Sequence, residues 1–275
     1  MMDTIRWGIL GASKFAREHM APAIRLAGNA DLVAIATSEA ARSAPFAAIA
    51  PGLRVHASYD ALLSDPGVDA VYVPLPNHLH VDWTLRAIAA GKHVLTEKPI
   101  ALRAEEIDRL IAARDASGLQ VAEAYMIVHH PQWQRARALV AEGAIGPLRH
   151  VDAAFSYDNR TDPGNIRNRP ETGGGGIRDI GVYTYGSARF VTGAEPAEVQ
   201  ARIRWENGVD VWAQVTGTFA GNGHQFTYAA MTSMRLFARQ EMVFQGDAGL
   251  IRLTAPYNAG VYGEARLELH RPGLS

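Results

Sequence analysis

The first half of the chain alternates short apolar runs with stretches of helix-forming residues. Apolar runs of strand length occupy residues 5–10, 31–36, 70–73, 94–95 and 120–123. Helix formers lie between them, most clearly over residues 81–90, which end at Gly91, and 104–116, which end at Gly118. Strands that alternate with helices at this spacing indicate βαβ units and a parallel sheet.

The pattern changes after about residue 125. A helical stretch at 131–142 is followed by longer alternating runs at 150–157, 198–205, 209–219, 225–230, 241–245 and 249–253. Turn residues such as Asn207-Gly208 separate several of these runs, and a glycine run at 173–176 precedes a helix expected over 177–191. The sequence therefore predicts an α/β protein whose second half contains a mainly antiparallel sheet with one covered face.

Composition places the chain among soluble globular proteins. Its 275 residues, 48% hydrophobic and 20% charged, suffice for two ordinary domains. A net charge of −1 produces no field that favours nucleic acid or an anionic membrane. The absence of cysteine excludes disulfides and thiolate chemistry. No signal-peptide pattern or apolar run of membrane-spanning length is found, so we expect a cytoplasmic protein.

A tight turn follows the first predicted strand and reads Gly11-Ala12-Ser13-Lys14-Phe15-Ala16. The dinucleotide-binding pattern Gly-x-Gly-x-x-Gly/Ala matches here, except that Ser13 replaces the second glycine. A serine hydroxyl can donate to phosphate, and the helix N-terminus adds free amides and a positive dipole end. An ordinary strand-to-helix turn is the alternative. We expect residues 11–15 to bind a nucleotide cofactor.

The end of the second strand bears on which nucleotide is bound. Asp31 begins this strand instead of ending it, so we reject it as the ligand of an NAD ribose. Thr37 and Ser38 follow the strand, with Arg42 one turn beyond. Two hydroxyls and a guanidinium suit a 2′-phosphate, whereas the nearby Glu39 keeps NAD(H) possible. The expected cofactor is NADP(H).

The run Glu97-Lys98-Pro99 ends another short apolar strand. Ligands of open α/β sheets bind beyond the carboxyl ends of the strands. Pro99 restricts Lys98 to extended geometry, and an ammonium held there can polarise an oxygen or lower the pKa of a neighbour. A solvated Glu–Lys pair is the alternative interpretation.

Three segments together resemble the glucose–fructose oxidoreductase / inositol dehydrogenase / rhizopine catabolism (Gfo/Idh/MocA) family over essentially the whole chain. They are the turn at 11–16, Glu97-Lys98-Pro99 and the glycine-rich segment 173–183. The resemblance implies an N-terminal Rossmann dinucleotide-binding domain at 1–124. It also implies a C-terminal α/β domain at 125–275, with a large open, mainly antiparallel sheet. Family members usually continue for another helix and strand, so either the second domain is truncated at Ser275 or those elements are dispensable.

The resemblance also implies an NAD(P)-dependent oxidoreductase acting on CH–OH groups. Its motif lysine corresponds to Lys98. Asp179 and Tyr183 stand where many inositol dehydrogenase-like members have aspartate and histidine. The tyrosine form is similar to the branch that holds glucose–fructose oxidoreductase, xylose dehydrogenase and dihydrodiol dehydrogenase.

These residues suggest a proton-transfer mechanism. A free tyrosine has a pKa near 10, but an ammonium within about 4–6 Å stabilises the tyrosinate. We expect Tyr183 to be the acid/base, with Lys98 as its electrostatic partner and as the anchor of the substrate oxygen. Asp179, one helical turn before Tyr183, is expected to orient substrate hydroxyls or to hold Lys98. A core aromatic on an apolar helix is the alternative for Tyr183.

Other residues are expected at the same site. Further cofactor contacts are expected from Leu75, Pro76, Asn77, His80, Glu97, Lys98 and Arg167, and the resemblance implies those of Asn77 and His80, whose segment is similar to one that lines the cofactor cleft in the family. Tyr157 is expected to contact the substrate together with Lys98, Asp179 and Tyr183. We expect no metal, because the adjacent His129 and His130 would point apart and no third ligand is evident.

The leading interpretation is an NADP(H)-dependent transfer of hydride to or from a sugar or polyol, of the aldose dehydrogenase or ketose reductase type. Reduction of an anhydro-ketose, or oxidation of an aromatic trans-diol, is an alternative on the same scaffold. A non-catalytic nucleotide-binding regulator is a third, against which the intact Lys98, Asp179 and Tyr183 argue.

The second-half sheet also bears on assembly. Residues 209–217 alternate between apolar and polar side chains, so one face has to be covered. We expect helices on one face and an apolar surface on the other, and exposed apolar faces mark interfaces. The sequence thus predicts a homodimer or homotetramer through the C-terminal sheet, and no nucleic-acid or membrane partner.

Overall fold

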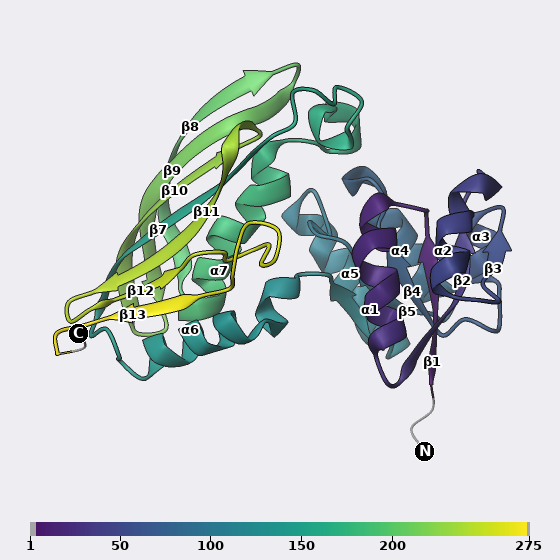
Figure 1. The fold of residues 1–275 in the computed structure, drawn as a ribbon, viewed down its shortest axis with the longest axis horizontal. Coiled ribbons are helices and arrows are strands. Elements are labelled where there is room, and N and C mark those ends of the chain that lie inside the picture. Colours follow the sequence, from purple (N-terminus) through teal and green to yellow (C-terminus); the bar gives the residue numbers. More distant parts are fainter. Residues whose placement is uncertain (1–3, 274–275) are drawn as a thin grey trace. The chain divides into compact units, whose positions relative to one another are not determined.

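The computed structural model describes residues 4–273. The chain divides into two compact units, Met1–Ala124 and Tyr125–Ser275, which are described separately (Figure 1).

The first unit is built around a six-stranded parallel sheet. Its strands are β1 (Ile5–Leu10), β2 (Ala30–Ala36), β3 (Arg54–His56), β4 (Ala70–Val73), β5 (His93–Thr96) and β6 (Val121–Glu123). Their order, β3-β2-β1-β4-β5-β6, is that of the doubly wound dinucleotide-binding fold. The unit's α-helices are α1 (Ala21–Leu26), α2 (Ala44–Ile49), α3 (Tyr59–Leu63), α4 (His80–Ala89) and α5 (Ala104–Ser117). A π-helical turn at Ala16–Met20 leads into α1.

Apolar side chains pack on both faces of this sheet. Ile9 and Ile35 belong to one buried cluster, and Leu10 and Val73 belong to another. Burial on both faces explains why these strands are continuous apolar runs in the sequence. Because the strands are parallel, the segments that follow β1, β2, β4 and β5 all lie at one edge, where ligands of such sheets bind.

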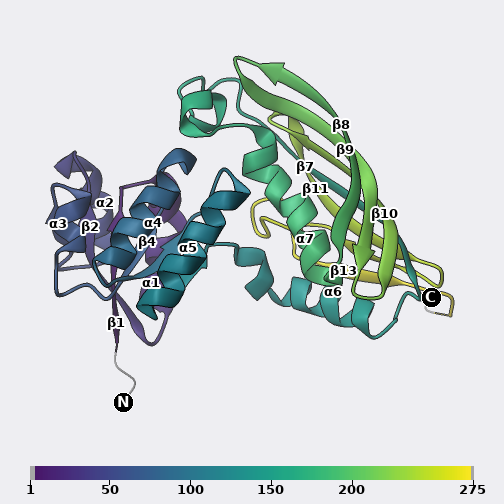
Figure 2. The same cartoon turned by 180° about the vertical axis from the view of Figure 1, so that it is seen from behind.

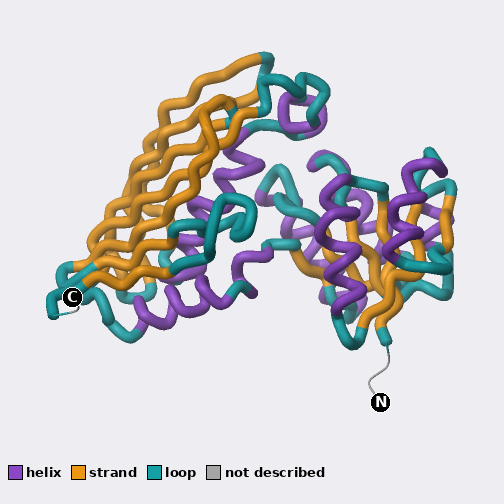
Figure 3. Tube along the Cα trace, viewed as in Figure 1, coloured by secondary structure: helices purple, strands orange, loops and turns teal. Residues whose placement is uncertain are grey.

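The second unit holds a seven-stranded sheet. Its strands are β7 (Leu148–Asp158), β8 (Glu195–Glu206), β9 (Val209–Gly221), β10 (His224–Ser233), β11 (Arg235–Gly246), β12 (Leu250–Leu253) and β13 (Leu267–His270). They are ordered β13-β12-β11-β7-β10-β9-β8, and only β7 and β10 pair in parallel. Figure 3 shows the strands of this sheet side by side in orange. The fold is therefore α/β with a mainly antiparallel second sheet, as predicted. The predictions missed β3, α3 and β13, which are all short.

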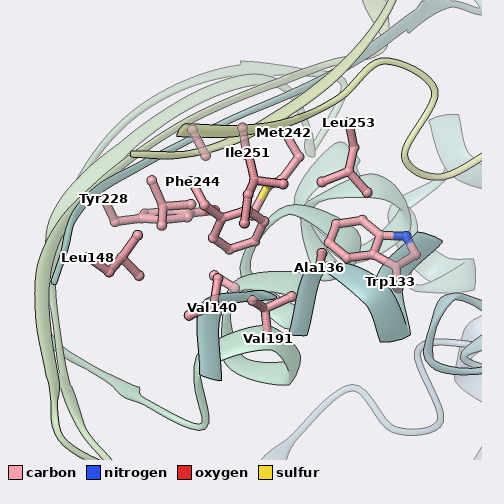
Figure 4. Packing of buried hydrophobic residues seen from close by; sticks show 14 of the residues in the cluster. Trp133, Ala136, Val140, Leu148, Val191, Tyr228, Met242, Phe244, Ile251 and Leu253 are labelled. Carbon is pink, nitrogen blue, oxygen red and sulfur yellow. The ribbon is translucent and has the colours of Figure 1, made fainter. Parts of the chain in front are cut away.

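Helices α6 (Pro131–Ala141) and α7 (Val182–Thr192) cover one face of the second sheet (Figure 2). Tyr228, Val151, Phe244 and Ile251 occupy successive strands in register and are buried on that face. Figure 4 shows these strands packing against Trp133 and Val140 of α6 and Val191 of α7. The Trp133 indole N–H donates to the carbonyl of Pro256, at 2.7 Å, so the buried ring is also hydrogen-bonded.

The expectation that the uncovered face is apolar is wrong. Thr216, Asp152 and Arg252 lie in one row on that face, separated only by Ala229 and Val243. The apolar side chains of the alternating strands face the chain's own helices, so these helices already bury them. Apolar side chains stay exposed instead on the edge strand β8. We call Val199 and Trp205, which are 59% and 61% exposed, the β8 strip.

Candidate active site

The turn after β1 has the geometry of a phosphate-binding loop. Gly11 has φ +98°, and a Cβ there would lie 3.1 Å from Cδ2 of Leu75, so glycine is required. The Ser13 hydroxyl accepts the Ala16 N–H at 3.0 Å and caps the first helical turn. This cap accounts for serine in place of the second glycine. The first amides of the following helix have no intrahelical acceptor and therefore suit a pyrophosphate.

Arg42 lies against this turn. Its Nη2 donates to the carbonyl of Ala12 at 3.0 Å, which brings a guanidinium from beyond β2 to the glycine turn. The Thr37 hydroxyl lies 3.3 Å from the backbone N of Glu39, and Thr37 is buried. Thr37 thus shapes the turn, whereas Ser38 is exposed. Arg42 therefore lies beside the glycine turn, and its contact with a cofactor phosphate stays a prediction.

Two carboxylates brace the backbone around Lys98. Glu97 accepts the Tyr72 hydroxyl at 2.6 Å with one oxygen and the Lys98 backbone N–H at 3.2 Å with the other. Glu123 accepts the N–H of Ile100 at 2.9 Å. Burial raises the pKa of Glu123. Sequence reasoning missed Glu123, although an acidic residue that ends an apolar strand was a usable signal.

His80 holds two loops of the same edge together. Its Nδ1 lies 2.8 Å from the carbonyl of Pro99 and its Nε2 lies 2.7 Å from the carbonyl of Leu75. The side chain is fully buried, and burial lowers its pKa. Both ring nitrogens face backbone carbonyls, and the expected contact of His80 with the cofactor stays a prediction. His80 positions the loops after β4 and β5 that carry Asn77 and Lys98.

In the second unit, a buried carboxylate organises the predicted substrate residues. Asp179 accepts the Tyr157 hydroxyl at 2.7 Å and forms an ion pair with Nε of Arg167 at 2.8 Å. The carboxylate of Asp179 holds the pKa of Arg167 above its ordinary value. Burial, and then the charge of Asp179, raises the pKa of Tyr157 well above 10. Tyr157 therefore stays protonated near neutral pH and acts as a hydrogen-bond donor.

Tyr183 lies in an aromatic cluster beside this network. Its ring centroid is 5.6 Å from that of Tyr125, 5.4 Å from that of Tyr257 and 5.8 Å from that of Phe155. Tyr183 is 6% exposed, and its deprotonated form would raise the pKa of Arg167. The ring is thus fixed by packing, within electrostatic reach of the Arg167–Asp179 pair.

The glycine run allows two close approaches at the start of the segment that carries Asp179. A Cβ on Gly174 would lie 2.5 Å from the carbonyl oxygen of Arg167. Gly175 has φ +117°, and its Cβ would lie 2.2 Å from Oδ1 of Asp210. The other oxygen of Asp210 accepts the N–H of Ile177 at 2.7 Å. Sequence reasoning missed Asp210, which is buried at the beginning of an apolar strand.

Comparison with protein families decides the membership. The family model described as "Oxidoreductase family, NAD-binding Rossmann fold" matches residues 5–125. The "GFO/IDH/MocA C-terminal domain" model matches residues 133–252. The chain belongs to the Gfo/Idh/MocA family of oxidoreductases.

Relatives within the family include sugar-modifying enzymes and an uncharacterised oxidoreductase. An uncharacterised oxidoreductase of Rhizobium meliloti is 42% identical over 94% of this chain and 76% of its own length. A dTDP-3,4-didehydro-2,6-dideoxy-alpha-D-glucose 3-reductase of Streptomyces antibioticus is 33% identical over 97% of this chain and 80% of its own. The crystal structure of a 3-ketoreductase from Actinomadura kijaniata, in complex with NADP and TDP-benzene, is 29% identical. It has a TM-score of 0.86 and covers 98% of this chain and 82% of its own.

Of the adjacent His129 and His130 in this Gfo/Idh/MocA protein, His130 caps a helix. His130 Nδ1 accepts the N–H of Gln132 at 3.2 Å and caps α6.

Over residues 4–273, no three His, Cys, Asp or Glu side chains gather as a metal site. No helix in that described range is both long and apolar enough to cross a bilayer.

Replacing Gly175 by alanine tests the close approach of the glycine run to Asp210. The substitution places a Cβ on the carboxylate and imposes a left-handed φ on an L-residue. We expect the free energy of unfolding to fall by at least about 1–3 kcal/mol, measured by urea denaturation of the full chain. Gly164→Ala is the control, since the nearest atom to its new Cβ is 3.9 Å away. Equal stability of the two variants would contradict this account.

Proposed function

We propose that the protein transfers hydride between NADP(H) and a sugar or polyol, at a carbonyl or alcohol carbon. Family membership supplies the reaction class. The observation that carries the substrate class is the Asp179 carboxylate, held by Tyr157 and Arg167 beside the Tyr183 ring. A fixed set of hydrogen-bonding groups of this kind suits a ligand rich in hydroxyl groups.

The preference for NADP(H) rests on Arg42. The guanidinium beside the glycine turn suits the 2′-phosphate of NADP(H). An NAD site would instead have an acidic residue that binds the ribose 2′-hydroxyl. The Actinomadura ketoreductase was solved with NADP, which agrees with this choice. When bound, the nicotinamide supplies or accepts the hydride. Gly11 to Phe15, Ser38, Asn77 and Glu97 remain proposed cofactor contacts.

Tyr183 is the proposed acid/base that moves the proton of the reacting hydroxyl. Lys98 stabilises the tyrosinate and anchors the substrate oxygen. Structures of the Actinomadura ketoreductase include one with a tyrosine replaced by phenylalanine and one with a lysine replaced by alanine. The same two residue types carry the chemistry proposed here.

Asp179 and its partners orient the substrate. Because the pKa of Tyr157 is raised by burial, this phenol is a donor and not a competing base. Arg167 keeps Asp179 charged as an acceptor for substrate hydroxyls, although a cofactor contact remains its alternative role. Assays with aldoses, polyols, anhydro-ketoses, aromatic trans-diols and nucleotide-linked keto sugars identify the substrate. No turnover with any member of the panel would favour a non-catalytic regulator.

Arg42→Ala tests the cofactor assignment. A charge-assisted contact to phosphate contributes on the order of 1.5–3 kcal/mol, so NADPH should bind roughly tenfold or more weakly. Binding of NADH should change little, because it lacks the 2′-phosphate. Fluorescence titration measures both, and Arg25→Ala, a surface arginine paired with Asp31, is the control. Equal loss for both cofactors would indicate a purely structural role, and a wild type that prefers NADH would refute the assignment.

Tyr183→Phe and Lys98→Met test the proton transfer. Removing the phenol hydroxyl should lower kcat by about 10²–10⁴-fold, while NADPH affinity stays near wild type. Lys98→Met should be at least as damaging, and the double variant little worse than either, because the residues act as a unit. Tyr185→Phe, on the same helix and 39% exposed, is the control. Single-variant turnover within a few-fold of wild type would end this assignment.

We also propose a homodimer or homotetramer through the C-terminal sheet. The support is now the β8 strip, whose apolar side chains lie on the edge strand of the sheet, which pairs with β9 on one side alone. Multi-angle light scattering at micromolar concentration should give at least a dimer, and Val199→Lys should dissociate it. Thr216→Lys, on the polar open face, should not. A monomeric wild type would refute the proposal.

A further inference from the structure

A hollow of about 440 Å³ lies in the second unit where β8, β9, β10 and β11 meet. Its lining residues are Arg160, Arg202, Ile203, Arg204, Glu206, Val211, Trp212, Ser233, Arg235 and Leu236. None of the residues proposed above for cofactor or substrate binding belongs to this set. The hollow is therefore lined by residues other than those proposed for hydride transfer.

Positive charge exceeds negative charge in this hollow. Glu206 is shared by two guanidinium groups, at 3.1 Å from Arg204 and 2.8 Å from Arg235. Arg160 pairs with Asp158, just outside the lining. No ion pair is found for Arg202 within the described range of 4–273. Four guanidinium groups thus meet two carboxylates, which favours an anionic ligand.

One of the four arginines forms a rigid wall. The side chain of Arg235 is only 12% exposed. Besides Glu206, its guanidinium donates to Asn159 Oδ1 at 2.6 Å, to Asn168 Oδ1 at 3.2 Å and to the carbonyl of Met234 at 2.9 Å. These bonds fix Arg235, whereas Arg202 and Arg204 are exposed and able to turn toward a ligand. A guanidinium fork matches the oxygens of a phosphate in a bidentate manner.

The rest of the lining is apolar and aromatic. Arg204 stands opposite Trp212 in the β8–β9 register, and Trp212 stands opposite Ser233 in the β9–β10 register. Leu236, which is 44% exposed, adds apolar surface. A charged end beside an aromatic ring suits a ligand that joins an anionic group to a sugar or a base.

We propose that this hollow binds a phosphorylated small metabolite, a phosphate monoester of roughly hexose-phosphate or mononucleotide size. Pockets that enclose small ligands measure about 300–1,000 Å³, and the hollow falls within that range. Arg202 and Arg204 bind the phosphate, and Trp212 contacts the ring that bears it.

Isothermal titration of the full chain with glucose 6-phosphate tests this site. Saturable binding is expected, with glucose at least tenfold weaker because it lacks the charge-assisted contacts. Arg202→Gln and Arg204→Gln should each weaken glucose 6-phosphate binding by roughly ten- to a hundredfold. Arg252→Gln is the control, since this arginine lies on the same open face but pairs with Glu241 away from the hollow. Adenosine monophosphate and inorganic phosphate, used in parallel, distinguish a need for the ring from a need for the phosphate alone.

Three results would overturn the proposal. The first is the absence of saturable binding by all three phosphate probes. The second is binding that survives Arg202→Gln and Arg204→Gln unchanged, which would place the phosphate at the nucleotide turn or the substrate site. Arg42→Ala and Arg167→Gln identify which of these it is. The third is that Arg202→Gln and Arg204→Gln each dissociate the oligomer and still bind phosphate. This result would mean that an acidic segment of a second copy fills the hollow.

Discussion

The carboxylate of Asp179 is the group on which the second unit's proposed chemistry depends. A buried carboxylate is costly unless it is paired and hydrogen-bonded, and Arg167 and Tyr157 meet that requirement. The pairing requires Arg167 to approach the segment that carries Asp179. That approach leaves no room for a side chain at Gly174, and Asp210 leaves none at Gly175. Gly174 is thus a packing requirement of the ion pair, and Gly175 is one of the approach of Asp210.

The first unit meets a different constraint, which is to hold the Lys98 ammonium and the proposed phosphate-binding turn at one edge of the sheet. Parallel pairing brings the loops together, and three buried or half-buried side chains then fix them. Glu97 and Glu123 accept backbone N–H groups on either side of Pro99, and His80 joins the loops that follow β4 and β5. The residues that face a ligand are therefore few, and most of the polar residues of the edge hold backbone.

Much of the fold was predictable, because strands buried on both faces are continuous apolar runs and long amphipathic helices end at glycines. The short elements β3, α3 and β13 carry too few residues for a period to show. The uncovered face of the second sheet was wrongly predicted to be apolar. Alternation along β9 shows that one face of the sheet is covered, but it does not show what covers that face. Family resemblance pointed to Lys98, Asp179 and Tyr183.

The positioning residues were harder to predict from the sequence. His80 was expected at the cofactor because its segment matches one that lines the cofactor cleft in the family, but its ring nitrogens lie against two backbone carbonyls that no pattern of side chains reveals. Asp210 and Glu123 accept backbone N–H groups distant in sequence, and Arg235 donates to the side-chain oxygens of Asn159 and Asn168, which are also distant in sequence. Interactions of this kind depend on tertiary register, which composition and spacing do not encode.

The most direct test of the central claim is the kinetic effect of Asp179→Asn on the best substrate of the panel. The account predicts that kcat/KM falls by at least about a hundredfold, since a charge-assisted acceptor and the anchor of Arg167 and Tyr157 are lost together. NADPH affinity, measured on the same protein, should stay near wild type, because the nucleotide turn belongs to the other unit. A kcat/KM within a few-fold of wild type, or a loss confined to NADPH binding, would contradict the account.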